Sequence, residues 1–514
     1  MTDLPKRPER CTLLHQLPAL QAARNAQATA LWWRGEVIDY GTLNDQVLKL
    51  AGRLAGTGAR GDRVAVLAWN CPEFVALIYA VPASGRILVP LNARLAPAEW
   101  IYQLQAAGVS ILFGDAELLQ PLLQHPDFPE NITVVDLQDD YVSWQETGPV
   151  APLPPTATVD PVWILYTSGS TGRPKGAVLT HRSFMAGLHS AALGRPVQSG
   201  DRYLYPFPLF HVAAHNVLLQ HRHGAAVILS RSFDANETLN ACRELQVTTM
   251  SLAPTMIAML LDHPQFSPAD LSTVRTIGYG ASAMPETLLR RLLTETDVGL
   301  CQSYGMTELS GSVAFLTVAD HQRAAQERPA LLQSVGKPLP TVDIKLESDT
   351  EQACAPGERG EILVKASQCM REYWRQPAET AETLRDGWLH TGDIGRFDPE
   401  GYLYIVDRKK DMIISGGENI ASREVEEVLR RHPAVRDCAV IGLPHPRWGE
   451  TPCAVLQLAA DTSDAALDVH CRQWLAAYKT PKRWIRVAAL PLNAAGKVDK
   501  PALRRAYGET PPGQ

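Results

Sequence analysis

Residues 166–176 read YTSGSTGRPKG, a run of small hydroxyl residues and glycines that ends with a lysine and a final glycine. Gly169, Gly172 and Gly176 permit tight turns and leave no Cβ in the way, so backbone N–H groups and hydroxyls can surround anionic oxygens. Phosphate is the ligand that this composition favours. It is not the mononucleotide P-loop, because the glycines and the Lys-Ser/Thr pair of that pattern do not occur at the required spacing. Taken alone, the stretch is also compatible with an ordinary flexible turn between the apolar runs VWILY and AVLTH.

Upstream of this loop, apolar runs of strand length alternate with amphipathic runs of helix length. The order is ALWW, TLNDQVLKLAGRLAG, DRVAVLA, PEFVALIYAVPASG and ILVPL. Thr42 and Pro72 stand where a helix cap or a first helical turn is expected, and the apolar residues from Leu43 to Leu54 recur at helical spacing. The alternation predicts β-α-β units.

A second series of the same kind follows the proline-rich connector at 148–161. Its predicted strands are VWILY, AAVIL, VTTMSL, VRTIGYG and VGLCQSYG, and its predicted helices include ANETLNACRELQ and PETLLRRLLTE. The two series predict two α/β subdomains within a large N-terminal region.

The pattern changes near residue 336, where period-two alternation and Gly, Pro and Asp turns predict antiparallel strands. After DRKKD at 407–411 the order becomes helix, strand, strand, helix, which predicts a small α+β domain of roughly a hundred residues. The predicted fold is therefore of the α/β class. It has an N-terminal region at 1–407, made of two α/β subdomains and a β-rich subdomain, and a small mobile α+β domain at 408–514.

The composition is that of an ordinary soluble globular protein, with 45% hydrophobic and 20% charged residues in 514. A formal net charge of −6 and the absence of long basic runs argue against a nucleic-acid partner. The nine cysteines show no C-x-x-C spacing, which favours free thiols in a reducing compartment. We find neither a signal-peptide pattern nor a transmembrane segment, and we expect a cytoplasmic protein.

Three further clusters carry residue types that suit a nucleotide. SYGMTE at 303–308 ends in Thr307 and Glu308, which could hydrogen-bond a phosphate and hold Mg²⁺. GWLHTGDIG at 387–395 places Asp393 on a turn, where a carboxylate can accept hydrogen bonds from ribose hydroxyls. DRKKDMIISGGENI and PLNAAGKVDK add a cationic segment, a Gly-Gly loop and Lys497. Each cluster alone is also compatible with a surface or turn position.

Together, and in this order, the motifs resemble the AMP-forming adenylating superfamily of acyl-CoA synthetases, peptide synthetase adenylation domains and beetle luciferases. The resemblance covers nearly the whole chain. It implies that ATP, Mg²⁺ and coenzyme A are used, and that the opening loop holds the phosphates of ATP.

The resemblance also implies roles for individual residues. Tyr304 would stack on adenine beside Gly305, Thr307 would contact the α-phosphate and Glu308 would bind the metal. Asp393 would take the ribose hydroxyls with help from Arg408, and Lys497 would bridge the carboxylate substrate and the α-phosphate. The β- and γ-phosphates would meet Thr167, Ser168, Gly169, Ser170, Thr171, Gly172 and Lys175. The expected catalytic residues are Lys497, Lys175, Glu308 and His211.

Other implied roles concern the two remaining substrates. Lys410 lies at the hinge position of the family, and coenzyme A would contact Gly416, Gly417 and Trp448. The acyl pocket is expected to contain His211, Val212, His215, Gly280, Ala281 and Met306. We interpret His221 and His223 as surface residues rather than a metal pair, because no third ligand lies nearby in the sequence.

The predicted function is an ATP-dependent carboxylate–CoA ligase that acts on a fatty or aryl carboxylic acid. The alternative is a stand-alone adenylating enzyme that loads a carrier protein, and an oxidative or non-catalytic family member is a more distant one. Small, apolar and aromatic residues in the expected pocket segments favour an apolar or aromatic acid. The sequence leaves the oligomeric state open, a homodimer included.

Overall fold

A computed structural model describes residues 11–147, 149–167, 174–280, 284–415, 418–445, 448–493 and 496–508. The chain packs as two compact units. Unit 1 contains residues up to 344 together with 364–389, and unit 2 contains 345–363 together with the chain from 390 onward. The chain therefore passes between the units three times. The division of the chain at residue 408 into a fixed and a mobile part stays a prediction.

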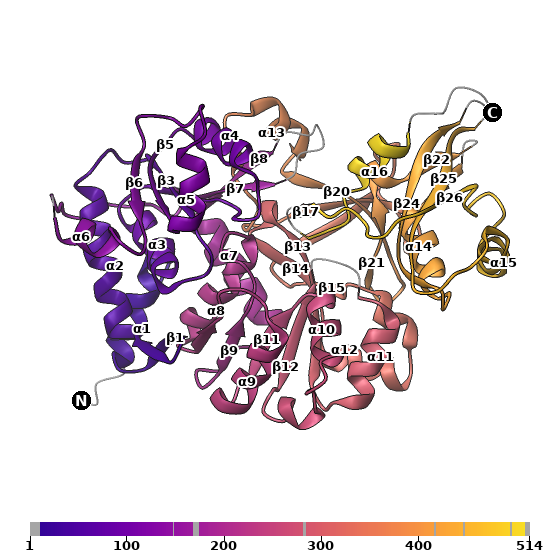
Figure 1. The fold of residues 1–514 in the computed structure, drawn as a ribbon, viewed down its shortest axis with the longest axis horizontal. Helices are drawn as coiled ribbons and strands as arrows, with labels where there is room; N and C mark the ends of the chain where they lie inside the picture. The colour runs from indigo at the N-terminus through magenta and orange to yellow at the C-terminus, as the bar shows by residue number, and fades with distance from the viewer. Residues whose placement is uncertain are drawn as a thin grey trace. The chain divides into compact units, whose positions relative to one another are not determined.

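The larger sheet of unit 1 has nine strands in the described residues, in the order β15-β14-β13-β12-β11-β9-β10-β1-β2. The six strands from β13 to β1 run parallel, and β2, β14 and β15 pair antiparallel at the two edges. Figure 1 shows β9, β11 and β12 side by side. The strands are β1 (Thr29–Trp33), β2 (Glu36–Asp39), β9 (Arg202–Tyr205), β10 (Ala226–Leu229), β11 (Thr249–Leu252), β12 (Thr276–Gly280), β13 (Gly299–Met306), β14 (Gly311–Leu316) and β15 (Lys337–Pro338).

The second sheet of unit 1 has the order β18-β8-β7-β4-β3-β5-β6. Its strands are β3 (Arg63–Leu67), β4 (Ile87–Pro90), β5 (Val109–Gly114), β6 (Thr133–Asp136), β7 (Pro161–Thr167), β8 (Lys175–Thr180) and β18 (Glu372–Tyr373). The two predicted series of strands do not map one to one onto the two sheets. β1 joins the later strands through β10, while β7 pairs in parallel with β4 of the first series. The predicted α/β class is confirmed, but the exchange of β1 and β7 was not foreseen.

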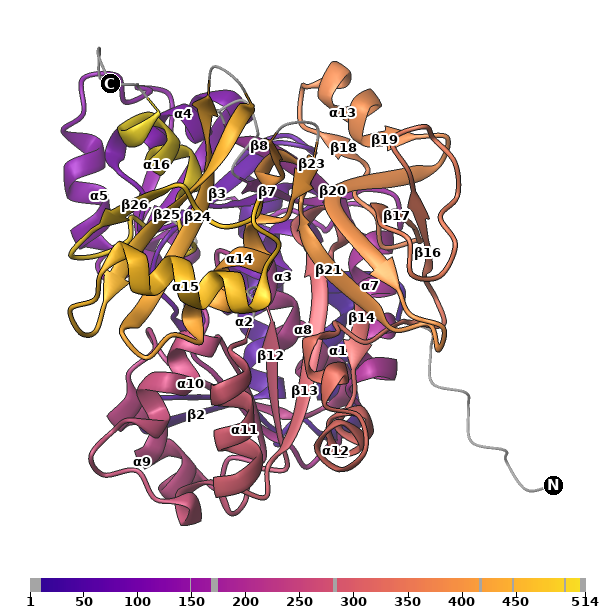
Figure 2. The ribbon, with the colours of Figure 1, turned by 90° about the vertical axis from the view of Figure 1, so that its right-hand side faces the viewer.

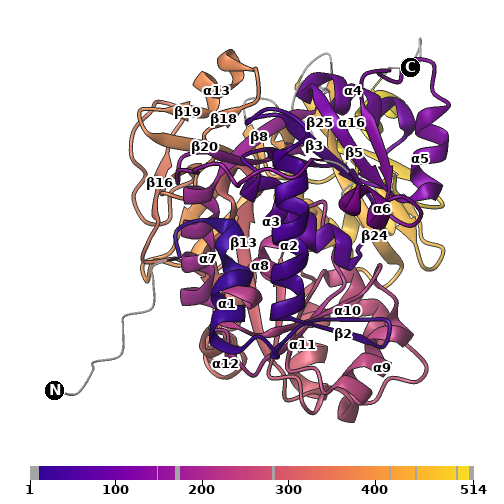
Figure 3. The same ribbon diagram turned by 90° about the vertical axis from the view of Figure 1, so that its left-hand side faces the viewer.

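Helices cover both faces of these sheets. Figure 3 shows α1, α2 and α3 side by side. The apolar side chains of α4 and α5 form one core with alternate residues of β3 and β4 and with Val109 and Leu112 of β5. The helices of unit 1 are α1 (Leu17–Asn25), α2 (Tyr40–Ala55), α3 (Pro72–Ala83), α4 (Pro97–Ala107), α5 (Ala116–Leu123), α6 (Tyr141–Glu146), α7 (His181–Gly194), α8 (His215–His223), α9 (Ala235–Leu245), α10 (Pro254–Leu261), α11 (Glu286–Glu295), α12 (Val318–Gln326) and α13 (Pro377–Thr383).

The starts of two early helices test the cap assignments. Pro72 is the first residue of α3, as its position in the sequence predicts. Thr42 lies in the first turn of α2, also as predicted, and Asp39 caps this helix by accepting a hydrogen bond of 2.7 Å from the backbone N–H of Thr42. A carboxylate at the N-cap suits the positive end of the helix dipole. Within the described ranges, every helix is too short or too polar to cross a bilayer.

Unit 2 contains most of the predicted β-rich segment. Along its longest strand, β20, buried and partly buried side chains alternate, as the sequence predicts. β20 and β21 pair antiparallel, with Asp393 opposite Arg408. The strands of this segment are β16 (Asp343–Glu347), β17 (Gly360–Lys365), β19 (Leu384–Arg385), β20 (Trp388–Phe397) and β21 (Leu403–Arg408).

The C-terminal sheet of unit 2 is buried on both faces. Alternate residues of β24 enter two cores: Cys438 and Val440 pack with α14 and α15, and Ala439 and Ile441 pack with Leu503 of α16. This explains why β24 is a continuous apolar run. Figure 2 shows α14 and α15 beside this sheet. The elements are β22 (Ile413–Ser415), β23 (Glu418–Ile420), α14 (Ser422–Arg430), β24 (Val435–His445), β25 (Gly449–Leu458), α15 (Asp464–Trp474), β26 (Arg483–Arg486) and α16 (Lys500–Tyr507).

Candidate active site

A buried carboxylate lies where β13 turns into β14. Glu308 belongs to a short 3-10 helix, Thr307–Leu309, and is 5% exposed. Its Oε1 accepts hydrogen bonds from the hydroxyl of Thr167 at 3.3 Å and from the hydroxyl of Tyr373 at 2.8 Å. Thr167 is the last residue of β7, directly before the glycine-rich loop. The fold therefore joins two predicted motifs that are 141 residues apart in the chain.

Glycine is required at the turn that carries this carboxylate. A Cβ at Gly305 would lie 1.9 Å from the carbonyl oxygen of Gly311, a separation that no side chain tolerates. This close approach lets β13 and β14 pair tightly next to the turn that carries Glu308. Tyr304 and Met306 flank Gly305 on β13, so the predicted nucleotide and acyl residues of this motif share one strand.

Lys175 begins β8 at the other end of the glycine-rich loop. Its ammonium pairs with the carboxylate of Glu379, which lies on α13. The same ammonium lies 5.4 Å from the ring centroid of Tyr373, whose strand β18 pairs with β8. Lys175 is almost fully buried. Unit 1 therefore places a cation and a carboxylate beside one tyrosine.

The donor set around Glu308 fits Mg²⁺. Hydroxyls of Thr167 and Tyr373 are the partners of this carboxylate, and no cation pairs with it in the described part of the chain. Mg²⁺ prefers oxygen ligands and is usually held by one or two carboxylates together with substrate phosphates. The described residues contain no group of three or more His, Cys, Asp and Glu side chains that could form a metal site of their own.

In unit 2 the predicted ribose ligand is also buried. Asp393 is 5% exposed, and its Oδ1 lies 2.8 Å from Nε of Arg408 on the neighbouring strand. The two residues are register partners of β20 and β21, so the strand pairing itself places the guanidinium beside the carboxylate. A buried carboxylate held in this way can accept two hydroxyl hydrogen bonds.

Lys497 lies in a tight turn closed by a bridge between Leu492 and Val498. The N–H of Asn493 donates to the carbonyl of Lys497 at 2.7 Å, and the N–H of Lys497 donates to Oδ1 of Asn493 at 3.0 Å. The pKa of Lys497 is lowered by desolvation and by the charge of Arg408, whereas Asp393 raises it. Within unit 2, Lys497 thus lies in the electrostatic field of the Asp393–Arg408 pair.

Three predicted acyl-pocket residues, His215, Gly280 and Met306, lie near the same turn of unit 1. His215 is buried, and its Nδ1 lies 3.0 Å from the carbonyl oxygen of Val212. Burial lowers the pKa of His215 to about 4, so its imidazole is neutral at pH 7. The ring lies against Gly311, where a Cβ would be 3.4 Å away. His211 precedes this segment, and Gly280 pairs with Ser303 of β13.

The two parts of the chain that carry these residues each match a known family. Residues 19–374 match the AMP-binding enzyme family, and residues 424–497 match the AMP-binding enzyme C-terminal domain. The chain belongs to the AMP-binding enzyme family. The resemblance to the AMP-forming adenylating superfamily is thereby confirmed.

Named relatives of this AMP-binding enzyme are acid–thiol ligases. A feruloyl-CoA synthase from Amycolatopsis sp is 37% identical over 503 residues, which cover 96% of this chain and 98% of the relative. A fatty acid–[acyl-carrier-protein] ligase from Streptomyces coeruleorubidus is 34% identical over 509 residues, 97% of each chain. These relatives confirm the predicted enzyme class.

The fold of a solved AMP-binding enzyme agrees with this one. The o-succinylbenzoate CoA synthetase from Bacillus subtilis, in complex with its acyl-adenylate intermediate, is 31% identical with a TM-score of 0.86. The similarity covers 96% of this chain and 99% of that one. The same enzyme has also been solved with ATP and a magnesium ion.

Several predicted site residues lie outside the described residues. They are Ser168, Gly169, Ser170, Thr171, Gly172, Ala281, Gly416 and Gly417. Of the remaining coenzyme A and hinge residues, Trp448 is 45% exposed and stacks against His445. Lys410 belongs to the 3-10 turn Lys409–Asp411 in unit 2. Their roles stay predictions.

The interpretation of His221 as a surface residue is wrong. His221 is fully buried, with Nδ1 2.7 Å from the hydroxyl of Tyr79 and Nε2 3.2 Å from the carbonyl oxygen of Ala30. His223 is partly buried. The physical reason is that the ring of His221 packs among Tyr79 of α3, Tyr40 of α2 and strand β1. Both imidazole nitrogens of His221 have partners within the core, which indicates a structural role.

Sequence reasoning missed Tyr373 and Glu379. Both lie in the segment REYWRQPAET at 371–380, which has no spacing typical of a phosphate or metal site. Their contacts depend on β18 pairing with β8, a connection between residues almost two hundred positions apart. The only local signal is a tyrosine followed by a proline and a carboxylate, which is also common in ordinary turns.

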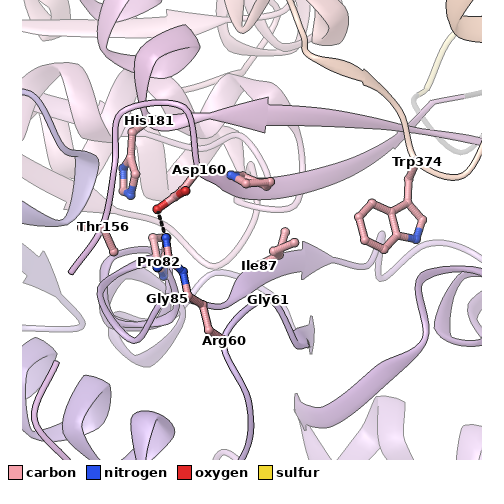
Figure 4. Close-up of a pocket in the computed structure, with 10 residues that line it drawn as sticks. Arg60, Gly61, Pro82, Gly85, Ile87, Thr156, Asp160, His181 and Trp374 are labelled. Carbon is pink, nitrogen blue, oxygen red and sulfur yellow. Dashed lines mark hydrogen bonds and ion pairs between the residues drawn. The ribbon is translucent and has the colours of Figure 1, made fainter. Parts of the chain in front are cut away.

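A separate cavity of about 190 Å³ lies in unit 1, at the starts of β4 and β7. Figure 4 shows the ion pair of 2.6 Å between Arg60 and Asp160, with His181 above it and Trp374 to one side. None of the ten residues that line this cavity belongs to the predicted sites. Its two charged residues pair with each other, and we assign it no role in the chemistry.

Proposed function

We propose that this protein is an ATP-dependent carboxylate–CoA ligase. In the first step a carboxylate oxygen of the substrate attacks the α-phosphorus of ATP, and the bond to the bridging oxygen of the β-phosphate breaks. The products are an acyl-adenylate and pyrophosphate. In the second step the thiolate of coenzyme A attacks the acyl carbonyl, a thioester forms, and AMP leaves.

The observation that carries this proposal is the hydrogen bond between Thr167 and Glu308. It brings the end of the glycine-rich loop to the carboxylate motif, with Lys175 at the other end of the same loop. A site for a metal-bound triphosphate needs an anion for the metal and a cation for the phosphates. Glu308 and Lys175 meet this need within one unit.

We assign Mg²⁺ to Glu308, with the hydroxyl of Thr167 beside it. When bound, the metal would neutralise charge on the phosphates. Lys175 and the glycine-rich loop would hold the β- and γ-phosphates, and Tyr304 the adenine. Asp393 with Arg408 would hold the ribose, and Lys497 would meet the negative charge that develops at the α-phosphate. Removing one preorganised partner of this kind typically slows a reaction roughly a hundred- to a thousand-fold.

For the acyl substrate we propose an aryl or fatty carboxylic acid. The neutral, buried imidazole of His215 and the glycines at 280 and 311 leave a pocket wall without a charged group at these positions. Such a wall suits an apolar or aromatic acid. Feruloyl-CoA synthase, at 37% identity, supports the aryl class.

Transfer to a carrier protein is the second candidate. The relative from Streptomyces coeruleorubidus is a carrier-protein ligase at 34% identity. The two functions share the first step and differ in the thiol that receives the acyl group.

A panel of aryl and fatty acids, assayed for pyrophosphate release with ATP and Mg²⁺, tests the first step. A comparison of thioester formation with coenzyme A and with a phosphopantetheinylated carrier protein distinguishes the two candidates. Stoichiometric release of ADP and phosphate would overturn both.

We also propose a cytoplasmic location. All nine cysteines are free thiols, six of them buried, which suits a reducing compartment. Fractionation of cells that produce the protein tests this location. A homodimer likewise stays a proposal, and sedimentation velocity tests it.

A further inference from the structure

Tyr373 lies beside both charged side chains that the proposed function assigns to metal and phosphate. It is 6% exposed, and its backbone pairs with Ala177 on β8, two residues after Lys175. Its hydroxyl donates to Oε1 of Glu308 at 2.8 Å. Its ring centroid lies 5.4 Å from the ammonium of Lys175. One side chain therefore contacts both the carboxylate and the cation.

The two charges do not pair with each other. Lys175 pairs with Glu379, and Glu308 accepts hydrogen bonds from two hydroxyls. Two opposite charges that approach closely in a buried site attract each other strongly. A direct pair between Lys175 and Glu308 would neutralise the cation intended for phosphate and the anion intended for metal. The hydroxyl of Tyr373 holds the carboxylate, while its ring lies beside the ammonium.

We propose that Tyr373 is a positioning residue that keeps Glu308 and Lys175 apart, so that each stays available to the metal and to the phosphates. This inference rests on the proposed function, because it assigns Glu308 to the metal and Lys175 to the triphosphate. The hydroxyl orients the carboxylate, and the ring separates the charges. The two parts of the side chain therefore have different consequences when they are removed.

Two substitutions separate these parts. Tyr373→Phe keeps the ring and removes the hydroxyl, so it leaves Glu308 with one donor fewer. Tyr373→Leu removes the ring and lets Lys175 approach Glu308. Tyr40→Phe is the matched control, because Tyr40 is fully buried and its hydroxyl donates to the carbonyl oxygen of Ala225, far from any charged group of the site.

The experiment measures metal and nucleotide binding without turnover. Binding of Mn²⁺ to the full-length protein saturated with α,β-methylene-ATP is followed by electron paramagnetic resonance. Binding of the same nucleotide in the presence of EDTA, and of AMP, is measured by calorimetry. Thermal unfolding of each variant reports folding.

For Tyr373→Phe we expect Mn²⁺ affinity to fall about tenfold, because a hydrogen bond to a charged group is lost, while metal-free nucleotide binding is unchanged. For Tyr373→Leu we expect both Mn²⁺ affinity and metal-free nucleotide affinity to fall at least tenfold, with AMP affinity unchanged, because AMP lacks the β- and γ-phosphates. Tyr40→Phe should alter none of these affinities.

Equal Mn²⁺ affinity in the wild type and in Tyr373→Phe would overturn the inference and leave the proposed function intact. A wild-type protein that binds neither nucleotide would instead overturn the proposed function, and the inference with it. If Tyr373→Leu does not fold, Tyr373→Phe decides the question alone.

Discussion

The ion pair between Lys175 and Glu379 predicts a substitution that strengthens ATP binding. If Lys175 receives the β- and γ-phosphates, the triphosphate must first displace the carboxylate of Glu379. Glu379→Gln keeps the size of this side chain and removes its charge. We expect the variant to bind ATP more tightly than the wild type, because the competing anion is gone.

The magnitude follows from the burial of the pair. The side chain of Lys175 is 11% exposed and that of Glu379 is 30% exposed. A hydrogen bond between charged groups contributes about 1.5–3 kcal/mol when it is buried, and partial exposure reduces this to about 1–2 kcal/mol. Because 1.4 kcal/mol corresponds to a factor of ten, the dissociation constant of ATP should fall about 5- to 30-fold. The ligand-free protein should lose a similar stability, since Lys175 is left without its carboxylate.

Calorimetric titration of the wild type, Glu379→Gln and Glu382→Gln measures this effect. Glu382 is an exposed residue of the same helix, α13, and serves as the matched control. ATP is titrated with EDTA present, and AMP is titrated in parallel. The affinity of AMP should not change in any variant, because AMP has no β- or γ-phosphate. Unchanged or weaker ATP binding by Glu379→Gln would refute the reasoning and would indicate that Glu379 helps to hold Lys175 in its binding position.

Three further predictions follow from the other contacts. Asp393→Ala should weaken ATP and AMP equally, about ten- to a hundred-fold, because both ligands carry the ribose; retained AMP binding in calorimetry would contradict this role. Lys497→Ala should slow adenylation roughly a hundred- to a thousand-fold and leave thioester formation from a supplied acyl-adenylate almost unchanged; equal slowing of both steps in rapid-quench measurements would contradict it. Burial lowers the pKa of His221 to about 4, so between pH 6.5 and 4 the unfolded state binds a proton that the folded state does not. The free energy of unfolding should therefore decrease as the pH is lowered from 6.5 to 4, by at most about 1.4 kcal/mol per pH unit for this residue. In urea unfolding, the free energy of unfolding of His221→Gln should depend less steeply on pH than that of the wild type. An identical slope in the two proteins would contradict the assignment.

The sequence alone was sufficient to determine the elements that depend on local pattern. Helical spacing from Leu43 to Leu54 predicted α2, and a first-turn proline at residue 72 predicted the start of α3. The residues that we propose for phosphate and metal were predicted in the same way. The glycine-rich loop, Glu308 and Asp393 each belong to a short motif, and the order of these motifs along the chain identified the family.

The tertiary structure decided which distant segments meet. The sequence pattern assigns β1 to the first series of strands and β7 to the second, yet β1 pairs with β10 and β7 pairs with β4. The partner of a strand depends on the path of the connections between strands, and not on the residues of the strand itself. His221 lies in a stretch typical of a polar helix end, and it is buried because its ring packs among α2, α3 and β1.

The same reason explains the two site residues that the sequence did not reveal. Tyr373 and Glu379 have no motif of their own, and they meet Glu308 and Lys175 only because β18 adds to the edge of β8. A motif records chemistry that neighbouring residues perform together, so it can be recognised in one stretch of chain. A contact across a sheet edge is set by backbone hydrogen bonds, which any sequence can form, and so it leaves no local signature.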